Sequence, residues 1–223
     1  MREEIVKIFI ENVGPHLHDI NSVAIVGGSL ADPEIQELEK IKQLNLDCYG
    51  IDQGLIQLNL NLPFNNDAKY DLVICSQVLE HVYDVKIAIE NLANLTRSNG
   101  FIWIACPASN RSHGSPHYYS AGYQPEMIIN LLSLFSVKVL FFGKLGSKRL
   151  YFMTHALRIW PSKKELRHPI FAYDFGRRNE NLVKKIIRFI YDLPGRFYSL
   201  LLTDELSSQV EFSTETFVFA RKS

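Results

Sequence analysis

Polar residues and glycines follow the apolar runs of this sequence, in an arrangement that suits ligand binding. The turn Gly27-Gly28-Ser29 comes directly after residues 23–26, a short apolar run typical of a buried strand. A glycine turn between a strand and a helix brings backbone N–H groups close to a ligand. Asp52 ends the next strand-like run, where its carboxylate can accept hydrogen bonds from both ribose hydroxyls. These residues predict a nucleotide-type ligand, with simple turn and cap roles as the structural alternative.

Histidines offer a second kind of chemistry, because a neutral imidazole can remove the proton of a reacting hydroxyl. His81 and His117 follow the fourth and fifth predicted strands, near the expected ligand, and His113 lies in the same region. His113 and His117 are four residues apart, but Gly114 and Pro116 argue against a helix that would make this spacing a metal site. We predict His81 and His117 as candidate bases, with a structural role as the alternative, and no metal.

Strands and helices alternate along the chain, as they do in a parallel sheet covered by helices on both faces. Ligands of such sheets bind at the carboxyl ends of the strands, where the residues above are expected. Apolar runs predict strands near 23–26, 47–51, 55–60, 70–75, 101–106, 137–142 and 216–220, helical spacing predicts helices at 2–12, 33–44 and 84–96, and residues 98–100 predict a turn.

Composition favours a single domain with its own core. The chain has 223 residues, 47% of them hydrophobic, which is enough to bury a sizeable core. Lys+Arg and Asp+Glu number 24 each, so no overall charge attracts nucleic acid or an anionic membrane. Cys48, Cys75 and Cys106 lack CxxC spacing and lie in strand-like runs, as reduced core cysteines do. With neither a leader pattern nor eighteen consecutive apolar residues, we expect a cytoplasmic protein.

Three segments carry a likeness to a known family. They are Leu62-Pro63-Phe64, Tyr70-Asp71-Leu72-Val73 and Leu79-Glu80-His81-Val82, and their order and spacing resemble an "LPF, aromatic-Asp-x-Val, LEHV" pattern. Asn99-Gly100-Phe101 with Pro107 is similar to the turn and fifth strand of the same family. On these residues, the region 23–142 resembles the class I S-adenosylmethionine-dependent methyltransferases, of the type 11/23-like kind.

The resemblance implies a Rossmann-like methyltransferase fold, an α/β fold with a mostly parallel seven-stranded sheet and helices on both faces. It implies S-adenosylmethionine as cofactor and S-adenosylhomocysteine as product. The residues it assigns are Gly27, Gly28 and Ser29 around the methionine portion, Asp52 and Gln53 at the ribose and adenosine, Asn59 and Leu60 near adenine, and Cys75, Ser76 and Gln77 beneath the methionine portion.

The first motif departs from the family pattern. Ile25, Ser29 and Ala31 stand where an acidic residue and two glycines are usual, and Asn59 or Asn61 replaces the usual aspartate near adenine. Loss of one ionic hydrogen bond costs about 1.5–3 kcal/mol. These changes predict weakened cofactor binding.

Three functions are compared on this basis. The first is S-adenosylmethionine-dependent O-methylation of a small molecule or glycan precursor. The second is a catalytically inactive methyltransferase-like protein that acts as a binding or partner subunit. The third, a nucleotide-dependent oxidoreductase or epimerase, is disfavoured by the missing GxGxxG spacing and by residues 79–82.

We interpret residues 1–223 as one methyltransferase-like domain, with 143–213 as a helical insertion or lid between the last two strands. Within it, residues 182–191 have helical spacing. Two roles of this insertion are left open: it covers the active site, or it adds a layer for packing or dimer contact. The expected partner is a small-molecule or glycan substrate, without nucleic acid or stable membrane insertion, and a homodimer is left open.

Overall fold

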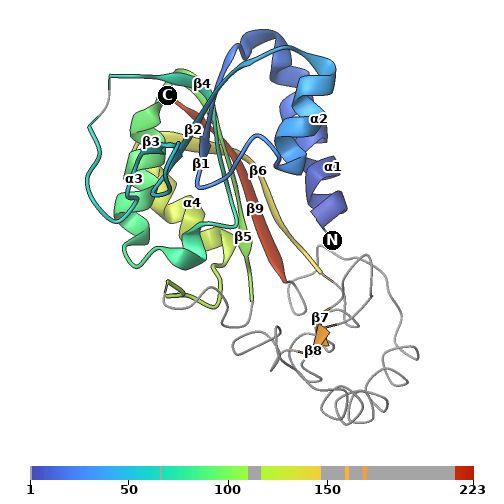
Figure 1. The fold of residues 1–223 in the computed structure, drawn as a ribbon, viewed down its shortest axis with the longest axis vertical. Helices are drawn as coiled ribbons and strands as arrows, with labels where there is room; N and C mark the ends of the chain where they lie inside the picture. Colours follow the sequence, from blue (N-terminus) through green and yellow to red (C-terminus); the bar gives the residue numbers. More distant parts are fainter. Residues whose placement is uncertain (1, 66, 110–116, 147–158, 161–167, 170–213) are drawn as a thin grey trace.

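The computed structural model describes one large sheet and one small one (Figure 1). Residues 2–65, 67–109, 117–146, 159–160, 168–169 and 214–223 are described. The large sheet contains β1 (Ser22–Val26), β2 (Asn45–Gly50), β3 (Ile56–Gln57), β4 (Tyr70–Ser76), β5 (Thr96–Pro107), β6 (Val137–Leu145) and β9 (Glu215–Lys222). The small sheet pairs β7 (Ile159–Trp160) with β8 (His168–Pro169), antiparallel.

The large sheet has the order β3-β2-β1-β4-β5-β9-β6. Neighbours from β3 to β5 are all parallel, whereas β9 is antiparallel to both β5 and β6. Every residue of β4 is buried, as expected for a central parallel strand covered on both faces. This arrangement confirms the predicted mostly parallel, seven-stranded, Rossmann-like sheet.

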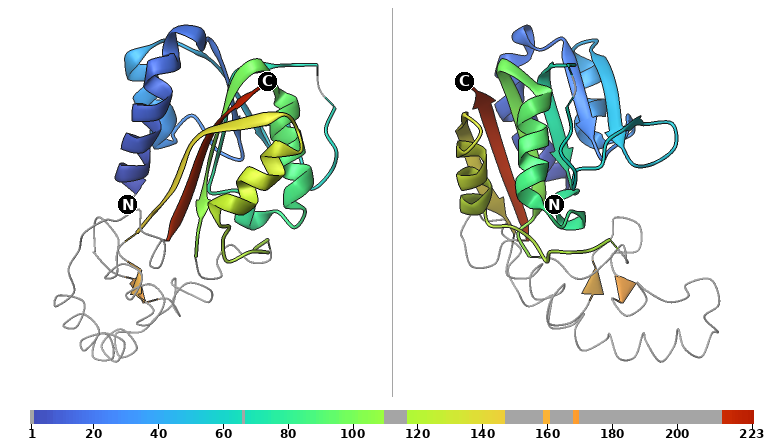
Figure 2. Two further views of the ribbon diagram at one scale, coloured as in Figure 1. Left: turned by 180° about the vertical axis from the view of Figure 1, so that it is seen from behind. Right: turned by 90° about the vertical axis from the view of Figure 1, so that its left-hand side faces the viewer.

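Helices cover both faces of the sheet, as predicted (Figures 1 and 2). The helices are α1 (Arg2–Val13), α2 (Pro33–Ile41), α3 (Val85–Leu95) and α4 (Pro125–Ser133), with the 3-10 turns η1 (Gly14–Asp19) and η2 (Leu79–His81). On one face, Phe9 of α1 and Leu38 of α2 pack in a cluster with Trp103 of β5. On the other, α3 and α4 bury Leu92 and Ile128 in a second cluster. The sheet therefore has an apolar core on each side.

Several elements differ in extent from the sequence predictions. β3 has only two residues. β5 begins at Thr96, before the turn predicted at 98–100. Asn99 has φ +63° there, and the pairing of β5 with β4 shifts register, so the strand continues through the predicted turn. β6 extends to Leu145, which pairs with Glu215 of β9. The predicted insertion boundary at 143 therefore lies inside a strand. The predicted helix at 182–191 lies outside the described residues.

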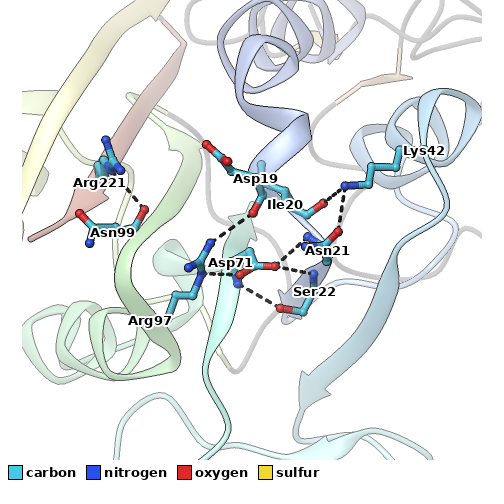
Figure 3. A network of polar contacts seen from close by, with 9 residues as sticks. All are labelled: Asp19, Ile20, Asn21, Ser22, Lys42, Asp71, Arg97, Asn99 and Arg221. Atoms are coloured by element: carbon cyan, nitrogen blue, oxygen red, sulfur yellow. Dashed lines mark hydrogen bonds and ion pairs between the residues drawn. The ribbon is translucent and has the colours of Figure 1, made fainter.

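A polar network joins the starting ends of the central strands, opposite the candidate site (Figure 3). The Asp71 carboxylate accepts the N–H groups of Asn21 (2.7 Å) and Ser22 (2.9 Å) and forms an ion pair with Arg97. Arg97 also donates to the carbonyl of Asp19 at 3.2 Å. This network connects the starts of β1, β4 and β5.

None of the helices in the described ranges is long and apolar enough to cross a membrane.

Candidate functional site

The glycine turn lies at the end of β1, beside the end of β2. Gly27 has φ +72°, a conformation that favours glycine, and its N–H donates to the Tyr49 carbonyl at 2.7 Å. A Cβ atom on Gly27 would lie 2.6 Å from a Val78 methyl group, and one on Gly28 would overlap the Asp32 carboxylate. Gly27 is thus favoured by its backbone conformation as well as by the contact with Val78, whereas a side chain at Gly28 would require the Asp32 carboxylate to move. The turn brings Val78, after β4, against the end of β1.

Asp32 is a site candidate that the motif comparison did not assign. It precedes Pro33, the first residue of α2, but its side chain does not cap the helix. Instead, Ser29 Oγ donates to Asp32 Oδ1 at 3.3 Å, and the Ala31 N–H donates to Ser29 Oγ at 3.3 Å. A carboxylate therefore stands at the glycine turn, although Ile25 replaces the expected acidic residue within the strand.

Asp52 and Gln53 lie in the exposed turn that follows β2. The pairing of Val26 with Tyr49 places this turn on the same edge of the sheet as Gly27. The Asp52 carbonyl accepts Gln57 Nε2 at 3.1 Å, while its carboxylate makes no hydrogen bond or ion pair with the described residues. That carboxylate is therefore free to accept the hydroxyls of a ribose.

The asparagines after β3 hold the loop in place. Asn59 Oδ1 accepts the Asn61 N–H at 3.0 Å, and Asn61 Oδ1 accepts the N–H groups of Tyr83 (2.8 Å) and Asp84 (3.2 Å). Leu60 is buried in the core on the α3 side. The Asn61 oxygen thus connects the loop to the start of α3, and Asn59 stays exposed at the site edge.

A buried asparagine of α3 fixes the Leu62-Pro63-Phe64 segment. Asn91 Oδ1 accepts the Phe64 N–H at 2.9 Å, while its Nδ2 donates to the Leu62 carbonyl at 2.9 Å. Asn91 is only 1% exposed, so its two hydrogen bonds tie this segment to the buried side of α3. No local pattern in the sequence signals this role, because the partners are 27 and 29 residues apart.

The end of β4 carries three candidates with different surroundings. Cys75 is fully buried, and this burial, followed by the nearby charge of Glu80, raises the pKa of its thiol. Ser76 Oγ donates to the buried Glu34 carboxylate of α2 at 3.1 Å. Gln77, at φ +59°, donates its N–H to the Ala105 carbonyl at 2.7 Å. Only Gln77 of the three is partly exposed.

The two predicted bases come together beyond the end of β4. Segment 117–120 docks on η2, because the N–H groups of Tyr119 and Ser120 donate to the Glu80 carbonyl at 2.9 and 3.2 Å. His81 Nδ1 lies 2.6 Å from the His117 carbonyl oxygen. Because a carbonyl only accepts, His81 Nδ1 must carry a proton, and the neutral ring keeps its lone pair on Nε2.

The buried Glu80 carboxyl group lies next to His81 and affects the pKa values of its neighbours. It is fully buried, and its Oε1 lies 3.9 Å from His81 Nε2. Burial, and then the charge of Glu80, raises the pKa of Tyr118 to about 12 and that of Cys106 well above its ordinary value. Sequence comparison identified Glu80 only as part of a motif.

Gly122 fixes the approach of segment 117–124 to the sheet. Its φ is +148°, and a Cβ atom there would lie 2.5 Å from the Pro107 carbonyl oxygen. We expect Gly122→Ala to lower the free energy of unfolding by about 2–4 kcal/mol in urea titrations, since the obstructing atoms belong to the backbone. Gly14→Ala is the control, because nothing lies within 4 Å of its Cβ position. Equal effects of the two changes would contradict this account.

Within the described ranges, no three His, Cys, Asp or Glu side chains gather into a group able to hold a metal ion.

Comparison with known proteins agrees with this geometry. A family model described as "Methyltransferase domain" matches residues 21–104, which span β1 to β5. No curated protein matches the sequence. The family match and the sheet order support the class I S-adenosylmethionine-dependent methyltransferase family. This match indicates a methyltransferase whose cofactor is S-adenosylmethionine.

Solved structures share the fold at low sequence identity. A SAM dependent methyltransferase from Archaeoglobus fulgidus is 14% identical, with TM-score 0.52 and coverage of 100% of this chain and 95% of that one. A putative sarcosine dimethylglycine methyltransferase from Galdieria sulphuraria is 10% identical, with TM-score 0.58 and coverage of 99% of this chain and 86% of that one. The [4+2]-cyclase SpnF, 12% identical, has TM-score 0.58 and coverage of 98% and 80%. The fold alone therefore does not define the reaction.

Proposed function

We propose that the protein transfers a methyl group from S-adenosylmethionine to a hydroxyl oxygen of a small molecule or glycan precursor. The observation that carries this proposal is the fixed tautomer of His81, whose lone pair on Nε2 can take a hydroxyl proton. The protein has three free cysteines, two of them buried, as expected in a reducing compartment. We therefore propose a cytoplasmic location.

The residues at the strand ends fit the cofactor. Asp52 offers an exposed carboxylate for the ribose hydroxyls, with Gln53 in the same turn along the adenosine. Asn59 and Leu60 border the adenine end. We assign the methionine portion to the edge formed by Gly27, Gly28, Ser29, Cys75, Ser76 and Gln77. Since Cys75 is buried, the backbone rather than the thiol provides its contact.

The proposed reaction requires little from the protein beyond alignment and one proton transfer. When bound, S-adenosylmethionine supplies a methyl group activated by its positive sulfur. His81 Nε2 removes the proton of the acceptor hydroxyl, while Nδ1–H remains bonded to the His117 carbonyl. Glu80 stabilises the imidazolium that results, at a separation of 3.9 Å. His117 then serves chiefly through its backbone, and its ring stays a second candidate base.

Calorimetric titration with S-adenosylmethionine and S-adenosylhomocysteine tests the cofactor site. We expect saturable binding to the wild type and an affinity about 100-fold lower in Asp52→Ala, because two hydrogen bonds to a charged group are lost. Asp67→Ala, a change at another exposed aspartate, is the control and should bind like the wild type. Unchanged affinity in Asp52→Ala would contradict the assignment of the ribose site.

A non-catalytic binding protein is the second candidate. It is favoured by the Asp32 carboxylate packed over Gly28, together with Ile25 in place of the usual acidic residue. The same titration decides between them, because absence of binding at millimolar ligand would support this candidate. Turnover of any acceptor would exclude it.

A further inference from the structure

Gln77 holds an uncommon backbone conformation at the candidate site. Its φ is +59°, in the left-handed region that non-glycine residues seldom occupy. The residue directly follows β4, and its N–H donates to the Ala105 carbonyl of β5 at 2.7 Å. Conformations of this kind persist where surrounding contacts enforce them, and they concentrate at functional sites.

Glu215 makes the contact that fixes the Gln77 side chain. Gln77 Nε2 donates to Glu215 Oε2 at 2.8 Å, across 138 positions of sequence. Glu215 is the first residue of β9 and pairs with Pro107 of β5 and Leu145 of β6. Its side chain is therefore anchored to a strand with a neighbour on each side.

The chemistry of this bond sets the orientation of the carboxamide. An ionised carboxylate only accepts hydrogen bonds, so the NH₂ group of Gln77 must face Glu215. The carbonyl oxygen of Gln77 then points away from Glu215, and it accepts no hydrogen bond from the described residues. The bond thus leaves the oxygen and one N–H of Gln77 available to a ligand.

Gln77 is also close to the glycine turn through its neighbour. Val78 follows it directly, and the Val78 methyl groups occupy the space beside Gly27. A change in the Gln77 backbone would therefore reach the end of β1, where the methionine portion of the cofactor is assigned.

We propose that Glu215 is a positioning residue for the cofactor, which acts by fixing the Gln77 carboxamide at the end of β4. This inference rests on the proposed function, because it assigns Gln77 to the cofactor site. Glu215 itself need not touch the cofactor. Its effect on cofactor affinity should pass entirely through Gln77.

A double-mutant cycle read by S-adenosylhomocysteine calorimetry tests this path. We expect Glu215→Ala to raise the Kd about tenfold in the wild-type background, and to have no further effect when Gln77 is already alanine. Glu215→Gln should restore most of the affinity, because its amide oxygen can still accept from Gln77 Nε2. Glu39→Ala, at an exposed carboxylate of α2, is the control for loss of a negative charge.

Thermal unfolding of each variant separates positioning from general stability. A lower Tm for Glu215→Ala with an unchanged Kd would overturn the inference and leave the pair a structural one. Additive effects of the two alanine changes on Kd would also overturn it, since Glu215 would then act independently of Gln77. Failure of the wild type to bind S-adenosylhomocysteine would instead overturn the proposed function, and this inference with it.

Discussion

Replacement of His81 by glutamine is expected to lower kcat by about 10²–10⁴-fold, the usual contribution of a general base. Glutamine can still donate an N–H to the His117 carbonyl, but its amide cannot take a proton from the acceptor. The affinity for S-adenosylhomocysteine should stay within about threefold of the wild type, since His81 is assigned to the acceptor side. The measurement is initial-rate turnover of an acceptor found by screening, with calorimetry alongside.

Two matched variants serve as controls for this experiment. His18→Gln alters an exposed histidine of η1 that pairs with Asp19, and it should leave kcat unchanged. His117→Gln keeps the backbone carbonyl that orients His81, so it should have a small effect. A large loss in His117→Gln, with His81→Gln near wild type, would assign the base to His117.

Replacement of Asp71 by asparagine is expected to lower the free energy of unfolding by about 2–4 kcal/mol at neutral pH. The carboxylate accepts two backbone N–H groups and pairs with Arg97 (Figure 3), and asparagine replaces one acceptor oxygen with a donor. Urea unfolding at pH 7 measures the loss. The control, Asp67→Asn, changes an exposed aspartate and should alter stability by less than about 0.5 kcal/mol.

The pH dependence of this difference follows from the titration of Asp71. Burial alone would raise the pKa of its carboxyl group, but the N–H donors of Asn21 and Ser22, and then the charge of Arg97, lower it below its ordinary value. A lowered folded-state pKa gives stability that is present above about pH 4 and lost as pH falls through the folded-state value. The gap between wild type and Asp71→Asn should therefore shrink on acidification. A gap that stays constant to pH 3 would contradict this linkage.

The elements that sequence predicted best are those in which the local pattern and the tertiary role agree. The run at 70–75 is apolar because β4 is buried throughout, and the spacing at 84–96 matches the buried face of α3. β3 was predicted too long, since only Ile56 and Gln57 pair with β2. β6 was predicted too short, because Gly143 to Leu145 extend it only through pairing with the distant β9.

Some residues of the candidate site were predicted from sequence and others were missed. His81 and His117 were predicted as separate candidates, and the structure brings the first against the carbonyl of the second. Glu215 and Asn91 carry no signal in a local window, because their partners are 138 and 27 residues away. Asp32 was not assigned to the site from sequence, whereas in the structure its carboxylate accepts a hydrogen bond from Ser29 at the glycine turn.

The place of β9 in the sheet has a consequence for the order of folding. β9 lies between β5 and β6, so β6 has no strand partner in the large sheet until residues 215–222 have been synthesised. Until then, β5 presents an unpaired edge, a surface that invites association with other chains. Closing the gap joins segments far apart in the chain, which slows folding. We therefore expect the half from β1 to β5 to form first during translation, and the last eight-residue strand to complete the sheet.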